Sequence, residues 1–370
     1  MSTPSSRKYI LLHDTTLRDG AQASGVFFDS SDKIAIARAL DAIGIDEIEV
    51  GTPAMGSHEE ADIARIRNLG LRCRLSVWCR ARTQDILSAA RSGVDGIHIS
   101  FPVSDILLQA LNKHRDWVLE RLQELIPLAA SRFAHVSVGA QDATRADEPF
   151  LFRFVEAAAR AGAHRLRLAD TVGVGRPETI KRLVTCCHQT APCLPLEFHG
   201  HNDLGLATAN ALIAAEAGAA ALSLTINGLG ERAGNAALEQ VVMILALHPA
   251  LCCGVDPTHL FSICRLAAIA SDRFMAPDRP IVGDLCFTHE SGIHCHALFR
   301  DRRSYEPFNP QSIGRRHRLT IGSHSGGAAL RHFLRQAGIE ASTDQIQALQ
   351  SLLRSGYNLS DPKDRRFIRP

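Results

Sequence analysis

Short apolar runs alternate with longer amphipathic stretches along the first 250 residues of the chain. The short runs favour β-strands, and the stretches between them carry apolar residues at helical spacing. The predicted strands are Tyr9–His13, Glu47–Val50, Arg74–Trp78, Gly96–Phe101, His135–Gly139, Arg165–Ala169, Leu196–His199 and Ala221–Ile226. The clearest predicted helices are Asp32–Ile43, Ala61–Leu69, Gln84–Arg91, Phe152–Ala161 and Pro177–Cys187.

Glycines mark the ends of several predicted helices. Gly44, Gly93, Gly162 and Gly218 each precede a predicted strand by a few residues, and glycine readily adopts the left-handed backbone that ends a helix. Eight strand–helix units within about 250 residues are typical of a (β/α)₈ TIM barrel. The alternative is a doubly wound open sheet, which is less favoured because no G-x-G-x-x-G follows the first predicted strand. We therefore expect a barrel domain over residues 8–250.

A second region begins where this alternation stops, near Pro249–Pro257. The pattern beyond it predicts a helix around Leu260–Phe274, a loop rich in proline, glycine and histidine, and then two short helices. Residues 258–370 are therefore expected to form a small, mainly helical C-terminal subdomain.

Composition excludes several classes of protein. Hydrophobic residues make up 45% and charged residues 22%, and 41 basic against 39 acidic residues give a net charge of +2. This balance gives no general attraction to nucleic acid or to a membrane surface. The apolar runs are too short for a membrane span and the N-terminus has no signal-peptide core, so a cytoplasmic protein is expected. None of the ten cysteines forms a C-x-x-C, which favours reduced, buried thiols.

Polar residues that suit a metal follow three of the predicted strands. The segments are His13–Gln22, His199–Asp203 and Asn227–Asn235. In TIM barrels the active site lies at the carboxyl ends of the strands, so these segments are expected to meet at one rim.

Two histidines give this rim its clearest chemical signal. His199 and His201 are two residues apart, so on a strand both side chains point the same way. Asp19 could add a carboxylate and Asn235 a carbonyl oxygen. Such a mixed nitrogen and oxygen set, with positions left for water, suits a divalent Lewis acid such as Mg²⁺, Mn²⁺ or Zn²⁺. An H-x-H pair alone is weak evidence, because two histidines on a strand are more often ordinary polar residues; the combination predicts a metal site.

Three long motifs resemble one family. DTTLRDGAQ, FHGHNDLGLA and NGLGERAGNAALE resemble the isopropylmalate synthase/homocitrate synthase family of TIM-barrel metal enzymes, and the resemblance covers nearly the whole chain. EVGTPAMG, VWCRA, HISFPVSDILL and VSVGAQDATRAD are similar to the homocitrate synthases that serve nitrogenase cofactor assembly.

The resemblance implies roles for residues at matching positions. Asp19, His199, His201 and Asn235 match the metal ligands, Arg18 the arginine that holds the oxo acid and stabilises the alkoxide, Thr171 a threonine on the substrate carboxylate, and Gln22 a glutamine near the substrate. His294, in the string SGIH, matches the catalytic histidine, and Tyr305 matches a tyrosine beside it. In this family the last two enter the active site from the neighbouring subunit of a homodimer.

Two positions depart from the family pattern. Ala21 stands where the first motif usually has an acidic residue. Gln141 stands where the family commonly has a glutamate that works with the catalytic histidine. Glutamine cannot take up a proton, although it can orient an imidazole by hydrogen bonding.

Simpler interpretations of these residues stay open at this stage. Arg18 could pair with Asp14 or Glu49 as a salt bridge at the rim, and Thr171 could be a turn residue. His294 stands in a predicted loop with His289 and His296, any of which could be a plain surface histidine.

The implied reaction condenses acetyl-CoA with a 2-oxo acid and releases CoA by thioester hydrolysis. For 2-oxoglutarate, the distal carboxylate needs polar partners, and Arg80, His98 and Ser100 on the third and fourth predicted strands are the candidates. Trp78 stands where some homocitrate synthases have a histidine. The alternatives are formation of isopropylmalate, citramalate or citrate, a metal-dependent lyase of the same superfamily, and a barrel without catalytic activity.

Overall fold

The computed structural model describes residues 7–355. The chain forms two compact units, Met1–Phe274 and Met275–Pro370.

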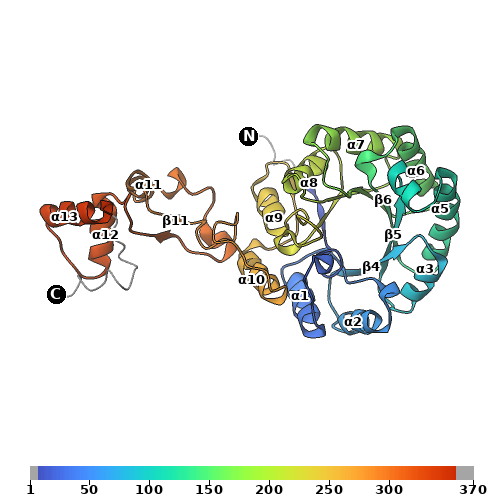
Figure 1. The fold of residues 1–370 in the computed structure, drawn as a ribbon, viewed down its shortest axis with the longest axis horizontal. Helices are drawn as coiled ribbons and strands as arrows, with labels where there is room; N and C mark the ends of the chain where they lie inside the picture. Colours follow the sequence, from blue (N-terminus) through green and yellow to red (C-terminus); the bar gives the residue numbers. More distant parts are fainter. Residues whose placement is uncertain (1–6, 356–370) are drawn as a thin grey trace. The chain divides into compact units, whose positions relative to one another are not determined.

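The first unit is built around a closed barrel of eight parallel strands (Figure 1). The strands are β2 Leu11–Asp14, β3 Glu47–Glu49, β4 Arg74–Arg80, β5 Gly96–Pro102, β6 His135–Gln141, β7 Arg165–Asp170, β8 Leu196–Gly200 and β9 Ala221–Leu224. The barrel closes where β2 pairs with β9, with His13 opposite Ser223. This confirms the predicted (β/α)₈ fold.

Helices surround the ring of strands, as Figure 1 shows most clearly for the helices that follow β4 to β7. The helices of this unit are α1 Ser30–Ala42, α2 Ser57–Arg67, α3 Thr83–Ala90, α4 Asp105–Ala110, α5 Arg115–Ala130, α6 Glu148–Arg160, α7 Pro177–Thr190, α8 Ala207–Glu216, α9 Leu238–Leu247 and α10 Leu260–Ala270. The glycines expected at helix ends adopt positive φ angles, for example 85° at Gly44 and 90° at Gly162.

The barrel interior carries charge, and the apolar core lies between the strands and the helices. On β7, Arg165 and Arg167 form ion pairs with glutamates of β3 and β8. Leu166 and Leu168 alternate with them and are buried, so they face the helices, because successive side chains on a strand point to opposite faces. The same alternation leaves polar side chains to reach the barrel mouth.

The ends of the first unit differ from the prediction in two places. The first predicted strand divides, because Lys8–Tyr9 (β1) pairs with Leu251–Cys252 (β10) outside the barrel. Helix α10, predicted as part of the C-terminal subdomain, belongs to the first compact unit. Its buried Leu260, Ile263 and Ala267 pack where it contacts α1 and the segment after β9.

The second unit contains a parallel strand pair, β11 Thr288–His289 and β12 Arg318–Leu319, and the helices α11 Gly292–Leu298, α12 Gly327–Gln336 and α13 Thr343–Arg354. Leu330, Ile346 and Leu353 form the small core of α12 and α13, which are the two short helices expected. The loop predicted around His294 is wrong: this segment is α11, which buries Cys295 and Leu298 one turn apart. Residues 356–370 of the predicted subdomain lie outside the described residues.

Short 3₁₀ turns connect these elements at Gly20–Gln22, Pro53–Met55, Ala143–Arg145, Ile226–Gly228, Pro257–His259, Arg302–Ser304 and Pro310–Ile313. All ten cysteines are free thiols. In residues 7–355, none of the helices has the length and apolar character needed to cross a membrane.

Candidate active site

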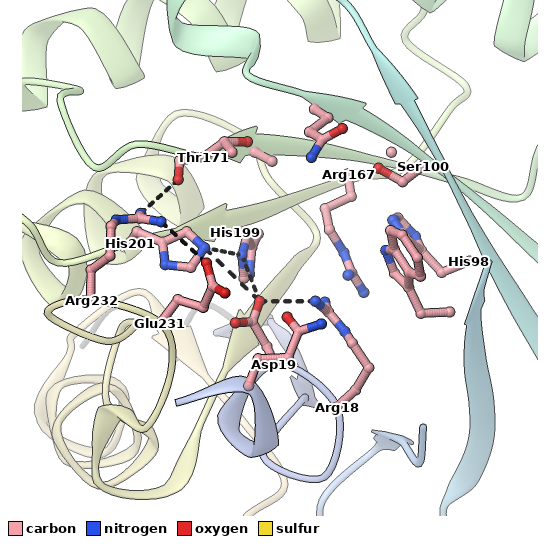
Figure 2. A pocket seen from close by; sticks show the side chains of 15 residues that line it. Arg18, Asp19, His98, Ser100, Arg167, Thr171, His199, His201, Glu231 and Arg232 are labelled. Carbon is pink, nitrogen blue, oxygen red and sulfur yellow. Dashed lines mark hydrogen bonds and ion pairs between the residues drawn. The ribbon is translucent and has the colours of Figure 1, made fainter. Parts of the chain in front are cut away.

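Three predicted metal ligands converge at the carboxyl end of the barrel (Figure 2). Nε2 of His199 lies 3.3 Å from Nε2 of His201 and 3.2 Å from Oδ2 of Asp19. His199 is on β8 and His201 follows it. Asp19 is held by a tight turn in which Thr15 O accepts hydrogen bonds from the backbone N–H groups of Arg18, Asp19 and Gly20.

Neighbouring groups fix the orientation of these ligands. Nδ1 of His199 lies 3.0 Å from Ser223 Oγ on β9, which leaves its Nε2 for the centre of the site. His201 forms an isolated antiparallel bridge with Asn235. The Asn235 side-chain amide donates to Leu229 O at 2.9 Å, so its Oδ1 is directed away from that carbonyl. Partners of this kind orient metal ligands in proteins.

The residues present fit a divalent cation. Oδ1 of Asp19 and Oδ1 of Asn235 are buried acceptor atoms that receive no hydrogen bond within residues 7–355. Burial opposes ionisation of Asp19, yet Arg18 and the two histidines hold its pKa well below its usual range. Burial, with a smaller contribution from the neighbouring His199, lowers the pKa of His201 to about 4, so this imidazole is neutral near pH 7. Two oxygens and two imidazole nitrogens are a suitable set for Mg²⁺, Mn²⁺ or Zn²⁺.

A pocket of about 220 Å³ opens beside these ligands. Nine residues selected from the sequence line it together: Arg18, Asp19, Gln22, His98, Ser100, Gln141, Thr171, His199 and His201. Its size is below that of pockets for drug-sized ligands, as expected for a small organic acid. Asn235 lies next to His201 and is buried, although it is not among the residues that line the pocket.

Arg18 forms the rim salt bridge that was considered for it and still lines the pocket. Its Nε donates to Glu49 at 2.7 Å and its Nη1 to Asp19 at 3.0 Å. Glu49 in turn binds Arg167 Nη1 at 3.0 Å. The two arginines and Glu49 therefore hold each other in place, and the salt bridge fixes Arg18 at the pocket wall.

Of the three candidates for a distal carboxylate, two are in the pocket. His98 and Ser100 line it, and Nδ1 of His98 lies 3.0 Å from Ser137 Oγ. Burial and the charge of Arg167 lower the pKa of His98 well below its usual range, so it is neutral. Arg80 does not line this pocket: its guanidinium binds Asp85 at 2.7 and 3.0 Å, at the start of α3. Its assignment to the oxo-acid pocket is corrected accordingly.

Two arginines that line the pocket were not selected from the sequence. Arg167 is buried on β7, and the signal for it was the alternation of arginine and leucine in a strand expected to be interior. Arg232, within the third motif, donates to Thr171 O at 2.8 Å and to Asp203. Arg232 could have been selected because it lies within the motif NGLGERAGNAALE.

Gln141 and Thr171 lie side by side at the ends of β6 and β7. Thr171 Oγ1 accepts a hydrogen bond of 2.8 Å from the N–H of Asp142. Asp142 itself is fully buried and is bound by Ser104 and Arg145. This carboxylate therefore cannot replace the glutamate that the family commonly has at position 141.

The second unit brings His294 and Tyr305 together. Their rings stack with centroids 3.9 Å apart, and Tyr305 is 40% exposed. Behind them, His289 stacks on His317, whose Nδ1 lies 2.6 Å from Glu306 Oε1. His289, Glu306 and His317 are close enough to hold a cation, like the barrel ligands.

Each of the two units matches a known protein family. The HMGL-like family matches residues 9–267, and the family described as homocitrate synthase post-HMGL domain-like matches residues 281–358. Homocitrate synthase 1 of Nostoc sp. is 43% identical over 93% of this chain and 92% of its own length. The 2-isopropylmalate synthase 2 of Caldanaerobacter subterraneus is 44% identical over 92% and 89%.

Solved structures agree on the fold of the barrel. Hydroxymethylglutaryl-CoA lyase from Pseudomonas aeruginosa superposes with a TM-score of 0.63 over 71% of this chain and 93% of that chain, at 23% identity. The sequence relatives match the second unit as well as the barrel. The chain belongs to the HMGL-like family and, within it, to the isopropylmalate synthase/homocitrate synthase enzymes.

Proposed function

We propose that the protein condenses acetyl-CoA with 2-oxoglutarate to form homocitrate and CoA. The observation that carries the proposal is the meeting of Arg18, Gln22, Thr171 and the ligand set around Asp19 in one small pocket. Hydrogen-bond donors and fixed charge in one buried place are what a 2-oxo acid and a developing alkoxide require.

Asp19, His199, His201 and Asn235 would hold a divalent metal, Mg²⁺, Mn²⁺ or Zn²⁺. When bound, such an ion supplies Lewis-acid chemistry to an oxygen of the substrate. Arg18, fixed by Glu49, places a permanent positive charge beside the position of the ketone oxygen. Thr171 and Gln22 line the same pocket and would orient the carboxylate of the oxo acid.

The acetyl methyl group is a weak carbon acid, so a positioned base must take its proton. We assign this role to His294, with Tyr305 stacked against it. Both are proposed to act on the partner's barrel in a homodimer. Gln141 would orient the imidazole by hydrogen bonding. Attack of the resulting carbanion on the ketone forms the new carbon–carbon bond, and water then cleaves the thioester and releases CoA.

The preference for 2-oxoglutarate rests on the far wall of the pocket. His98, Ser100 and Arg167 line it, and these groups can satisfy a second carboxylate. A pocket for an isopropyl group would be lined by apolar side chains, because burying a charge without partners is unfavourable. The second candidate is 2-isopropylmalate formation, favoured by the similarity to the Caldanaerobacter enzyme named for that product.

One assay separates these candidates. Thiol release from acetyl-CoA is measured with 2-oxoglutarate, 2-oxoisovalerate and pyruvate, and kcat/KM is compared. We expect 2-oxoglutarate to exceed the others by at least tenfold, since an apolar substrate leaves buried polar groups unpaired at a cost of about 1–3 kcal/mol. A higher kcat/KM for 2-oxoisovalerate would overturn the homocitrate assignment and leave the condensation chemistry intact.

The likeness to homocitrate synthases of nitrogenase cofactor assembly supports a role in nitrogen fixation, which predicts that a disrupted gene is rescued by added homocitrate.

The proposed location of the protein is the cytoplasm. Its ten free thiols are in keeping with that reducing compartment.

A further inference from the structure

The second unit holds a cluster of ionisable side chains that the proposed reaction does not use: His289, Glu306 and His317. His289 lies on β11 opposite Leu319 of β12, and His317 stands two residues before Leu319. Paired residues of two strands point to the same face, as do residues two apart along one strand. His289 and His317 therefore share a face. The side chain of Glu306, only 4% exposed, meets His317 there.

The arrangement of the two imidazoles does not suit a metal. The lone pair of an imidazole nitrogen lies in the plane of its ring, so stacked rings aim their lone pairs side by side rather than at one point. The rings of His289 and His317 are stacked, with their planes 26° apart. The rings of His199 and His201, by contrast, stand at 88° to each other and can converge on one ion. The cluster in the second unit is therefore held by stacking and hydrogen bonding.

This cluster is joined to His294 on two sides. Glu306 directly follows Tyr305, and the ring of Tyr305 stacks on His294 with centroids 3.9 Å apart. The ring of His289 meets that of His294 edge-on, with centroids 6.3 Å apart.

Both of these contacts depend on His317. A carboxylate only accepts hydrogen bonds, so Nδ1 of His317 donates to Glu306 Oε1 at 2.6 Å. This bond ties the segment that carries Tyr305 to the start of β12. Nε2 of His289 is buried and forms no hydrogen bond within residues 7–355, so stacking on His317 holds its ring in place.

We propose that Glu306, through His317, positions the imidazole of His294 for proton abstraction from the acetyl group. The pair fixes the rings of Tyr305 and His289, which confine that imidazole on its face and at its edge. A base must lie within hydrogen-bond reach of the proton that it takes, and a displacement of about 1 Å can lower a rate about a hundredfold. Glu306 is thus a positioning residue and does not touch the substrate. This inference rests on the proposed function, because it takes the role of His294 from it.

The turn around Glu306 has anchors besides this hydrogen bond. Arg302 O accepts the backbone N–H groups of Tyr305 and Glu306 at 3.2 and 3.0 Å. The ring of Phe308 packs against that of Phe287, with centroids 5.4 Å apart. Variants of the Glu306 side chain should therefore still fold.

The test separates the hydrogen bond from the size of the side chain. Glu306→Met keeps the length of the side chain but removes the acceptor oxygen, so kcat should fall about 10–100-fold, with KM for both substrates within about twofold of the wild type. Glu306→Gln keeps an acceptor oxygen and should stay within about threefold of the wild-type kcat. Asp301→Asn changes an exposed acid that caps the preceding turn. It is the matched control and should leave kcat unchanged.

The acetyl methyl group shows which step has slowed. If His294 is misplaced, proton abstraction limits turnover, so trideuteroacetyl-CoA should give a primary isotope effect on kcat in Glu306→Met at least as large as in the wild type. Rates are measured with whichever 2-oxo acid the enzyme condenses and are expressed per folded chain, determined by circular dichroism. His317→Leu removes the donor instead of the acceptor and should behave as Glu306→Met does; it decides the question if Glu306→Met fails to fold.

Three results would overturn the positioning role: a wild-type kcat in Glu306→Met, a lowered kcat without an isotope effect, or a loss in Glu306→Gln equal to that in Glu306→Met. A bound ion that Glu306→Met and His317→Leu remove would also overturn it, since the cluster would then be a metal site. His294→Ala distinguishes these results from failure of the proposed function. If His294→Ala keeps wild-type activity, the base was assigned wrongly in the proposed function. An inactive His294→Ala beside a fully active Glu306→Met defeats this inference alone.

Discussion

Buried polar side chains in this barrel are held by partners on neighbouring strands. His199 and His98 both lie at the barrel mouth, and each places Nδ1 3.0 Å from a serine hydroxyl one strand away, Ser223 and Ser137 respectively. The same histidine–serine contact therefore orients two histidines that differ in what they face. One histidine faces the carboxylate of Asp19, whereas the other lines the oxo-acid pocket.

This pair gives a prediction with an internal control. Ser223→Ala removes the partner that orients His199, so metal affinity should fall about 10–100-fold. Ser137→Ala should raise KM for the oxo acid and leave metal affinity near the wild-type value. Both serines are buried on strands of the same barrel, Ser223 on β9 and Ser137 on β6, so a general packing defect would affect the two variants alike. Metal affinity is measured by competition with a chromogenic chelator, and equal losses in both variants would count against the assignment of His199.

A second residue-scale prediction concerns Asp14. Burial raises the pKa of its carboxyl to about 7, and the hydrogen bonds from Thr16 offset this only in part. A carboxyl whose pKa is raised on folding contributes stability below its unfolded pKa and loses that contribution as the pH rises through 7. The total change has an upper bound of about 4 kcal/mol. The stability of Asp14→Asn relative to the wild type should therefore increase between pH 5 and pH 8 in urea unfolding, and a difference independent of pH would contradict it.

Residue-level predictions from the sequence succeeded where one short segment sets the geometry. The H-x-H spacing on one strand was enough to place His199 beside His201. Arg167 was missed because its partner Glu49 is 118 positions away in the chain, and only barrel closure brings them together. Arg80 was placed wrongly because Asp85, five residues later, captures its guanidinium once α3 begins.

At the scale of the element, the segment after β9 includes a backbone conformation that favours glycine. Gly234 has a φ of 89°, and a Cβ there would collide with the carbonyl oxygen of Gly228. Gly234 O also accepts the N–H of Asn202, between His201 and Asp203. The loop therefore sets the position of Asn235 and its bridge to His201.

Gly234→Ala should thus lower both stability and metal affinity. We expect a loss of unfolding free energy of about 3 kcal/mol, because the collision adds to the strain of a left-handed alanine. Gly162→Ala is the matched control: its φ is also positive and a Cβ there meets nothing within 4 Å, so it should cost about 1 kcal/mol and leave metal binding intact. Urea unfolding and metal titration measure both effects, and equal behaviour of the two variants would refute the role given to this loop.

Elements were predictable from periodicity, whereas their packing was not. The strand–helix alternation identified the barrel, since each strand and each glycine-terminated helix is encoded locally. Helix α10 was assigned to the wrong region because the apolar pattern of a helix predicts that one face is buried, but not which element packs against that face. Helix α11 was read as a loop because its seven residues are too few for a periodic signal.

At the scale of the whole molecule, the proposed reaction needs groups from both units. The barrel carries the pocket and the ligand set, and the second unit carries His294 with Tyr305. Sequence motifs predict both groups, but no pattern within one chain determines which subunit's His294 serves which barrel. That question depends on how copies of the chain associate.

Mixing two inactive variants tests the shared site. His199→Ala removes a proposed metal ligand from the barrel, and His294→Ala removes the proposed base from the second unit. If His294 serves the partner's barrel, a heterodimer contains one site with both groups intact and one with neither. Equal mixing then restores about one quarter of wild-type activity, because half of the dimers are mixed and each has one complete site. If His294 served its own barrel, no site in any dimer would be complete. Thiol release is measured after subunit exchange has been verified by mass spectrometry of differently tagged chains, and heterodimers without activity would rule out a base supplied by the partner.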